Sequence, residues 1–214
     1  MYDRKKLAER LRLYMICGEG DAPGAVIEKT RAALAGGVTA VQLRVKSWTG
    51  RETYETALKL KELCAERGAL FFVNDRLDVA LASHADGVHL GQKDLPVDAA
   101  RAIAGLDFII GGTARTPELA REAQRLGADY VGCGAAFGTA TKGDAVVIGP
   151  AGIKKTLSAI EIPSVAIGGI ELANVRELAG CGASGISLSG AIVRADDPES
   201  AARALINEIN KYFM

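Results

Sequence analysis

The sequence predicts an α/β fold, a single (β/α)8 TIM barrel that comprises residues 1–214 as one domain. The chain of 214 residues has the length of one such barrel. Short apolar segments alternate along it with segments of helical periodicity, as expected when helices connect parallel strands. Many of its 25 glycines stand between a helical segment and the next apolar segment, where a helix C-terminal cap is expected.

Eight short apolar segments, each bounded by turn residues, are predicted to be buried parallel strands: 13–17, 40–45, 70–74, 87–90, 108–112, 130–133, 164–167 and 185–188. Helical periodicity predicts helices over 23–35, 51–67, 77–83, 97–104, 117–126, 150–159, 173–179 and 198–212. Five prolines support the helix starts, where a missing N–H costs nothing: Pro23, Pro96, Pro117, Pro150 and Pro198. A doubly wound sheet is the alternative, but it favours fewer strands and a G-x-G-x-x-G loop, whereas GEGDAPG follows the first strand here.

Charge and composition limit the classes of partner. Lys plus Arg and Asp plus Glu both number 26, and a formal net charge of zero argues against nucleic acid or an anionic membrane surface. No apolar run approaches the roughly 18 residues of a membrane span, and the charged start lacks the apolar region of a signal peptide. We therefore expect a cytoplasmic protein that binds small molecules. The sequence leaves its oligomeric state open, a homo-oligomer included.

Cysteine and histidine spacing does not favour a zinc site or a disulfide. The four cysteines are far apart and form no CxxC pair, so we expect buried free thiols in a reducing compartment: Cys17, Cys64, Cys133 and Cys181. His89 falls inside a predicted strand, which favours a packed, hydrogen-bonded histidine over a ligand.

Polar residues gather at the end of the second predicted strand. Alternation places Gln42, Arg44 and Lys46 on one face of it. Chemistry in a TIM barrel is located at the C-terminal ends of the strands, and buried cations require a partner. An arginine guanidinium can donate two parallel hydrogen bonds to a phosphate or pyrophosphate, and a lysine ammonium adds a compact positive charge. A salt-bridge cluster at the rim is the alternative.

Two carboxylates follow the next two strands. Asn74 and Asp75 end the third strand, and Asp94 follows the fourth, so the two acids are predicted to be neighbours. They could bind Mg²⁺, which commonly takes one or two protein carboxylates together with substrate phosphate oxygens and water. A plain ion-pair network with the nearby cations and a general acid/base pair are the alternatives.

Hydroxyls and glycines follow the later strands. Thr113 comes after the fifth strand, and the long segment 134–143 carries two threonines and a lysine, which would suit closure over an anion or form an ordinary solvated loop. Glycines after the seventh and eighth strands permit close backbone approach to a phosphate. The residues therefore predict two anion-binding regions, and no nucleophile–base–orienter set is evident.

Six motifs, in order over about 130 residues, resemble the thiamine-phosphate synthase (thiamine phosphate pyrophosphorylase) family. They are Q-L-R-x-K at 42–46, N-D at 74–75, G-V-H-L-G-Q-x-D at 87–94, D-Y-x-G-x-G at 129–134, T-x-T-K at 139–142 and I-G-G-I at 167–170. The family joins 4-amino-2-methyl-5-pyrimidinylmethyl diphosphate to 4-methyl-5-(2-phosphoethyl)thiazole and releases pyrophosphate. The resemblance implies a dissociative reaction that needs no protein base to activate the thiazole nitrogen.

The resemblance also implies a role for each matching residue. The pyrimidine diphosphate would be bound by Gln42, Arg44, Lys46, Asn74, Thr113 and Lys142, of which Arg44, Lys46 and Lys142 would be catalytic. Mg²⁺, the implied cofactor, would be bound by Asp75 and Asp94. The thiazole phosphate would be bound by Thr139, Thr141, Gly169, Ser189 and Gly190.

Two positions depart from the family pattern. Thr113 stands where the family usually has Ser, so a hydroxyl is kept. An ungapped match puts Gly190 at the Ser of the family's V-S-A-I, with Ser189 one position early, so backbone N–H groups or Ser189 would supply that phosphate contact. The alternatives are a thiazole tautomerase-like isomerase, which lacks the diphosphate-binding set, and a non-catalytic phosphate-binding barrel.

Overall fold

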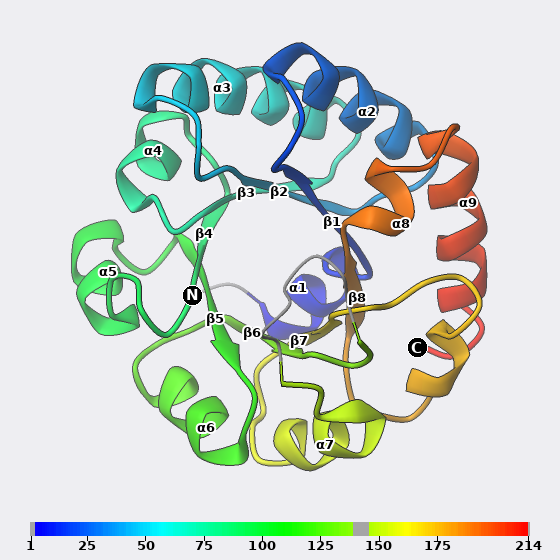
Figure 1. Ribbon diagram of the computed structural model, residues 1–214. Helices are drawn as coiled ribbons and strands as arrows, with labels where there is room; N and C mark the ends of the chain where they lie inside the picture. The colour runs from blue at the N-terminus through cyan, green and yellow to red at the C-terminus, as the bar shows by residue number, and fades with distance from the viewer. Residues whose placement is uncertain (1–2, 139–145, 214) are drawn as a thin grey trace.

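The computed structural model describes residues 3–138 and 146–213 and has eight parallel strands closed into a barrel (Figure 1). The strands are β1 (Leu13–Gly18), β2 (Ala40–Arg44), β3 (Leu70–Asn74), β4 (Gly87–Leu90), β5 (Ile109–Ala114), β6 (Tyr130–Gly134), β7 (Ser164–Ile167) and β8 (Gly185–Leu188). Each strand pairs with the next in parallel, and β8 pairs with β1. The barrel prediction is confirmed, and the doubly wound alternative is excluded by the closure.

The strand bounds agree closely with the sequence prediction. The third, fourth, seventh and eighth strands have the predicted limits. The strand β5 ends two residues later than predicted, at Ala114, because the ladder with β6 continues through the pairs Thr113–Gly132 and Ala114–Cys133. Thr113 is therefore a strand residue and not the first residue of a loop.

Helices surround the barrel, and the first of them lies over its middle (Figure 1). They are α1 (Arg4–Arg10), α2 (Pro23–Ala35), α3 (Gly50–Glu66), α4 (Leu77–Ala82), α5 (Val97–Ala104), α6 (Pro117–Arg125), α7 (Gly149–Leu157), α8 (Gly190–Val193) and α9 (Pro198–Ile209). The sequence reading did not predict α1 or α8. It was wrong at 173–179, where the structure has only the 3-10 turn η1 (Val175–Leu178). Here the Asn174 side chain accepts a hydrogen bond from the Glu171 N–H and donates one to the Gly169 carbonyl. Asn side chains often compete in this way with the backbone hydrogen bonds of a helix.

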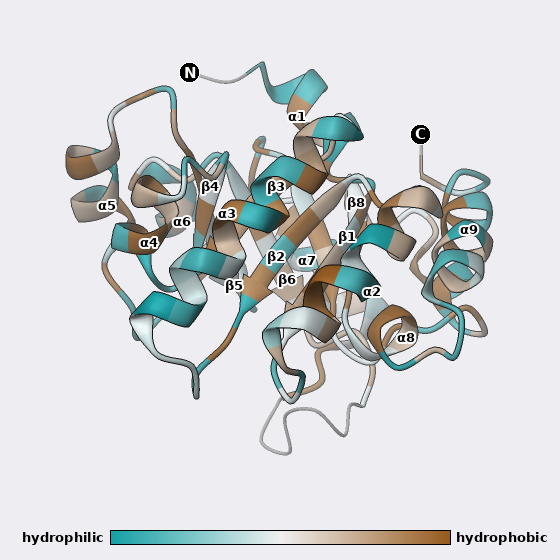
Figure 2. Ribbon diagram, turned by 90° about the horizontal axis from the view of Figure 1, so that it is seen from above, coloured by the Kyte–Doolittle hydropathy of each residue, from teal (hydrophilic) through white to brown (hydrophobic). Residues whose placement is uncertain are grey.

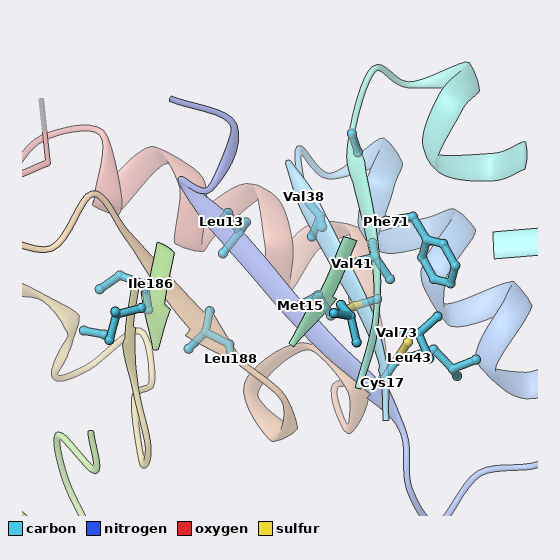
Figure 3. Close-up of a cluster of buried hydrophobic side chains, with 14 of the residues drawn as sticks. Leu13, Met15, Cys17, Val38, Val41, Leu43, Phe71, Val73, Ile186 and Leu188 are labelled. Carbon is cyan, nitrogen blue, oxygen red and sulfur yellow. The ribbon is translucent and has the colours of Figure 1, made fainter. Parts of the chain in front are cut away.

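Alternate strand residues face two separate hydrophobic cores. The larger core lies between the strands and the helices, and Figure 3 shows Leu13, Met15 and Cys17 in a row along β1 beside Val41 and Leu43 of β2. Alternation then turns the residues between them toward the barrel axis.

The smaller core fills the barrel interior. It contains Tyr14, Phe72, Ile109 and Tyr130 from four strands, together with Leu7 and Leu11 from α1 and its C-cap. Figure 2 shows α1 and α8 at opposite ends of the barrel. Because α1 covers the N-terminal ends of the strands with apolar side chains, the opposite, C-terminal rim is the end available for polar chemistry.

The prediction of buried free thiols is confirmed for all four cysteines. Burial raises the pKa of Cys17 and of Cys133 to about 12, so these thiols stay protonated and unreactive at neutral pH. In the described ranges 3–138 and 146–213, no helix has the length and apolar character needed to span a membrane.

Candidate active site

Predicted site residues from three strands face the barrel axis in the half toward the C-terminal rim, with Gln42 buried below it. Gln42 and Arg44 alternate on β2 with outward-facing residues, so both turn toward the barrel axis. Asn74 ends β3, and Thr113 is the penultimate residue of β5. Lys46 lies just beyond the end of β2 and is exposed. The order of the barrel strands thus brings residues far apart in the sequence to one edge.

Arg44 is paired within this rim. Its guanidinium Nη1 lies 3.6 Å from Oε2 of Glu19, which follows β1, and the two side chains are 20% and 46% exposed. An ion pair this open to water contributes about 0.2–1 kcal/mol. A ligand phosphate can therefore replace Glu19, because it would accept two charge-assisted hydrogen bonds from the Arg44 guanidinium.

The backbone holds Asp75 and Asp94 in defined turns. Asp75 has a left-handed φ of 62°, uncommon for a residue other than glycine, and its N–H donates to the carbonyl of His89 at 2.9 Å. Asp94 closes a turn with Gly91: its N–H donates to the Gly91 carbonyl at 3.2 Å, and its Oδ2 accepts from the Gly91 N–H at 2.8 Å. A Cβ on Gly91 would lie 2.8 Å from that Oδ2, so a larger residue there would displace the Asp94 carboxylate.

The charges of three predicted residues act on Asp75 at this rim. Burial, and then hydrogen bonding and charge from Asp94, raise the pKa of Asp75 to about 6 against the opposing effect of Lys46 and Arg44. The two carboxyl groups therefore share one small site, next to the two cations. The structure brings these four residues together as the sequence reading expected.

The acidic pair suits a hard divalent cation. Two carboxylates that repel each other can both ionise when a cation lies between them, and Mg²⁺ takes one or two protein carboxylates and completes its shell with phosphate oxygens and water. Among residues 3–138 and 146–213, no group of three or more His, Cys, Asp or Glu forms a complete metal cage. The donor set thus fits Mg²⁺ that is shared with a substrate.

Thr113 is connected to polar groups inside the barrel. Its hydroxyl lies 2.9 Å from Nε2 of His89, and Nδ1 of His89 lies 3.1 Å from the hydroxyl of Tyr130. The expectation of a packed, hydrogen-bonded His89 is confirmed. Gln42 in turn donates from Nε2 to the hydroxyl of Tyr14 at 2.8 Å.

The sequence reading missed Tyr14 and Tyr130 as polar residues of the interior. Each is at an inward position of its strand, one residue from an outward-facing neighbour of the larger core. Their hydroxyls are polar tips on buried rings, and a buried phenol normally finds a hydrogen-bond partner. Inward alternation together with that chemistry was the signal that could have identified them.

The second predicted anion-binding region, expected after strands six to eight, has its described residues in the turns after β7 and β8. Gly169 has a left-handed φ of 62°, and a Cβ there would lie 2.3 Å from the carbonyl oxygen of Gly138, so only glycine fits. Ser189 is the N-cap of α8, and Gly190 begins that helix. A Cβ on Gly190 would lie 3.1 Å from Nε and Nη2 of Arg194, which brings a guanidinium to this turn.

Three predicted residues cannot be placed. Thr139, Thr141 and Lys142 lie outside the described residues. Their roles therefore stay predictions.

Known proteins share both the sequence and the fold of this chain. The sequence profile described as thiamine monophosphate synthase matches residues 13–192. The thiamine-phosphate synthase of Coprothermobacter proteolyticus is 46% identical over 206 residues, which cover 96% of this chain and 98% of that protein. The thiamine-phosphate synthase of Pyrococcus horikoshii is 46% identical over 197 residues, 92% of this chain and 94% of that protein.

A solved structure agrees with these matches. Thiamine phosphate pyrophosphorylase from Pyrococcus furiosus superimposes with a TM-score of 0.89 at 41% identity, covering 97% of this chain and all of that one (100%). A 3-hexulose-6-phosphate synthase, at 19% identity and a TM-score of 0.73, shares the barrel fold alone. By the extent of the profile match and the identity to these relatives, this chain belongs to the thiamine monophosphate synthase family.

Proposed function

We propose that this chain catalyses the reaction for which its family is named, the synthesis of thiamine phosphate. The substrates would be 4-amino-2-methyl-5-pyrimidinylmethyl diphosphate and 4-methyl-5-(2-phosphoethyl)thiazole, and pyrophosphate would leave. The observation that carries the proposal is the cluster of Asp75, Asp94, Arg44 and Lys46, in which each charge acts on Asp75. Two acids and two cations on one rim match a diphosphate that arrives with a divalent metal ion.

The cations would act on the leaving group. Arg44 and Lys46 both act on Asp75 of the acidic pair, and the family resemblance assigns Lys142 to the same diphosphate. As the C–O bond to pyrophosphate breaks, negative charge grows on the bridging oxygen, so cations fixed beside it stabilise the transition state more than the ground state. Removal of one such contact typically lowers turnover about 10²–10³-fold.

Asp75 and Asp94 would bind Mg²⁺ together with the diphosphate oxygens. Bound there, Mg²⁺ would neutralise negative charge on the leaving pyrophosphate. The left-handed turn at Asp75 and the Gly91 turn at Asp94 hold the two carboxyl groups at the rim before substrate arrives. This geometry reduces the reorganisation that binding would otherwise require.

The remaining residues would orient the two reactants. Gln42, Asn74 and Thr113 face the barrel axis from three strands and would bind the pyrimidine diphosphate. Gly169, Ser189 and Gly190 would approach the thiazole phosphate through their backbone, together with Thr139 and Thr141. Held opposite the breaking bond, the thiazole nitrogen already carries the lone pair that forms the new bond, so a protein base is not required.

One incubation tests the function against its two alternatives. The purified protein is mixed with both substrates and Mg²⁺, and the products are separated by chromatography. We expect thiamine phosphate and pyrophosphate. Conversion of the thiazole phosphate to an isomer without release of pyrophosphate would identify a tautomerase-like isomerase. Saturable binding of the substrates without any product would identify a phosphate-binding barrel and contradict the proposal.

A further inference from the structure

Five polar side chains form a continuous chain of hydrogen bonds across the barrel interior. Gln42 Nε2 lies 2.8 Å from the Tyr14 hydroxyl, which lies 2.9 Å from the Tyr130 hydroxyl. The Tyr130 hydroxyl lies 3.1 Å from His89 Nδ1, and His89 Nε2 lies 2.9 Å from Thr113 Oγ1. The five residues come from β2, β1, β6, β4 and β5, so the chain connects opposite sides of the barrel.

The surrounding residues are shaped to hold this chain. Tyr14 and Tyr130 are 1% and 0% exposed, and burial raises the pKa of both phenols, so both keep their protons. A Cβ on Gly111 would lie 2.2 Å from Cζ of Tyr130, and one on Gly132 would lie 3.1 Å from Cε1 of His89. Two strand glycines thus provide the space in which the Tyr130 and His89 rings lie.

The donors and acceptors give the chain a direction. Tyr14 accepts a hydrogen bond from the Gln42 amide, and in the part of the protein that the structure describes its hydroxyl has one further partner, Tyr130. The single Tyr14 proton is therefore donated to Tyr130, and the Tyr130 proton to Nδ1 of His89. The opposite direction would give the Tyr14 hydroxyl two donors and leave its own buried proton unbonded, which is costly.

The direction of the hydrogen-bond chain determines which nitrogen of His89 carries the proton and where the Thr113 hydroxyl can donate. When Nδ1 of His89 accepts, a neutral ring carries its proton on Nε2 and donates it to Thr113. The Thr113 oxygen then accepts this bond, so the hydroxyl's own proton is left for a different acceptor. Thr113 is half-buried at the rim, near the C-terminal end of β5.

We propose that Tyr14, Tyr130 and His89 are positioning residues that hold the Thr113 hydroxyl as a hydrogen-bond donor to the diphosphate of the substrate. The proposal rests on the proposed function, because that function supplies the anionic acceptor. A donor that is oriented before the reaction needs no reorganisation while charge develops on the leaving group. Tyr14 and Tyr130 would thus contribute to turnover without contacting the substrate.

Nitrogen-15 NMR of the whole protein tests the direction without any activity measurement. The chain has two histidines, and the exposed His84 serves as an internal reference. We expect His89 at neutral pH to be the tautomer protonated on Nε2. In the Tyr130→Phe variant, which has no donor to Nδ1, the His89 signals should move while those of His84 stay in place. An Nδ1-protonated His89 in the wild-type protein would overturn the proposal whether or not the protein makes thiamine phosphate.

A double-mutant cycle tests the effect on turnover. We expect Tyr130→Phe to lower kcat roughly tenfold with KM for the pyrimidine diphosphate within about twofold, because the donor is misdirected and not lost. In a Thr113→Val background, which has no hydroxyl to orient, Tyr130→Phe should have no further effect on kcat. In a Thr113→Ser background, which keeps the hydroxyl, the tenfold effect should return. If Tyr130→Phe lowered kcat equally in the Thr113→Val and Thr113→Ser backgrounds, Tyr130 would act only on the structure of the barrel. That result would overturn the proposal.

Discussion

Asp75 carries two features that do not favour folding in the absence of a ligand. Its backbone is left-handed, and the pKa of its carboxyl is raised to about 6 by burial and by Asp94. A carboxyl whose pKa is higher in the folded state than in the unfolded state stabilises the fold at pH values below the pKa of the unfolded state. That contribution is lost as the pH rises through the folded-state pKa. At pH 7.5 the ionised Asp75 therefore costs stability, and a bound cation would remove that cost.

The Asp75→Asn variant should separate metal binding from folding. In metal-free buffer at pH 7.5 we expect its Tm to equal or exceed that of the wild-type protein, because the repulsion with Asp94 is gone. Added Mg²⁺ with pyrophosphate should raise the wild-type Tm and leave that of the variant unchanged. Turnover should fall roughly 100-fold or more, as expected when charge neutralisation at the leaving group is lost.

Differential scanning fluorimetry and a steady-state assay provide these measurements. Glu28→Gln, which removes an exposed acid from α2, is the matched control and should behave as the wild-type protein does. A variant that retained the Mg²⁺-dependent rise in Tm would show that Asp75 is not a metal ligand.

Glu19 competes for the guanidinium of Arg44, which would otherwise bind the diphosphate. The pair is 3.6 Å apart and half-open to water, so its contribution is about 0.2–1 kcal/mol. We expect Glu19→Gln to tighten pyrophosphate binding by roughly twofold to fivefold, measured by isothermal titration calorimetry at low salt. The Arg44→Gln variant should bind pyrophosphate weakly whether residue 19 is Glu or Gln. Tightening by Glu19→Gln that persisted in the Arg44→Gln background would contradict this competition.

At the scale of elements, one kind of hydrogen bond recurs at the N-terminal end of the barrel, between the strands of each successive pair. The residue before β2, β4, β6 or β8 accepts a side-chain hydrogen bond from a backbone N–H at the start of the strand before it. The four bonds are Leu13 N–H to Thr39, Phe71 N–H to Asp86, Ile110 N–H to Asp129, and Ser164 N–H to Ser184. Each bond fixes the register of two neighbouring strands, and so fixes which residues reach the opposite rim.

Asp129 is the most strongly held of these groups. Its carboxylate accepts from Ile110 N–H at 2.8 Å and pairs with Arg101, which also donates to the carbonyls of Gly105, Phe108 and Gly127. Because the paired side chains are 15% and 11% exposed, Asp129→Ala leaves a largely buried cation without its partner. We expect a loss of roughly 3–5 kcal/mol in the free energy of unfolding, measured by urea denaturation.

Glu122→Ala is the control for Asp129→Ala, since it removes a carboxylate from an exposed pair with Arg125. It should change the free energy of unfolding by less than about 1 kcal/mol. A similar small change for Asp129→Ala would contradict its structural role.

The strand glycines also predict a measurable effect. Gly111→Ala would place a Cβ 2.2 Å from Cζ of the buried Tyr130 ring, so the ring or the strand must move. We expect a loss of about 1–3 kcal/mol in the free energy of unfolding, typical of overpacking, together with reduced turnover as Tyr130 leaves its hydrogen bonds.

Gly24→Ala provides the contrast to Gly111→Ala. Position 24 lies in the first turn of α2, and a Cβ there meets no atom within 4 Å. This variant should be as stable as the wild-type protein or slightly more stable. Equal stability of Gly111→Ala and Gly24→Ala would contradict the packing described for Tyr130.

At the scale of the whole molecule, the barrel was predictable because its signals are local and repeated. Apolar strands, glycine caps and prolines at helix starts each depend on a few adjacent residues. The helix α1 was not predictable in this way, since it is charged along most of its length and is held through Leu7, which packs inside the barrel. The turn η1 was misread because the Asn174 side chain competes with the helix for backbone partners.

The site was predictable to the extent that its residues carry charge at strand ends. Arg44, Asp75 and Asp94 are visible in the sequence because an acid or a cation after a buried strand needs a partner. The hydrogen-bond chain through Tyr14 and Tyr130 was not visible, because it depends on which strands face each other across the barrel. That arrangement follows from barrel closure and from the space left by Gly111 and Gly132.

The most direct test of the account is phosphorus-31 NMR of the wild-type protein with both substrates, with and without Mg²⁺. We expect thiamine phosphate and pyrophosphate in a one-to-one ratio, formed only when both substrates and Mg²⁺ are present, and lost in an Asp75→Asn, Asp94→Asn double variant. Pyrophosphate released without thiamine phosphate would show simple hydrolysis. Such hydrolysis, or full activity of the double variant, would contradict the assignment of this rim as the site of condensation.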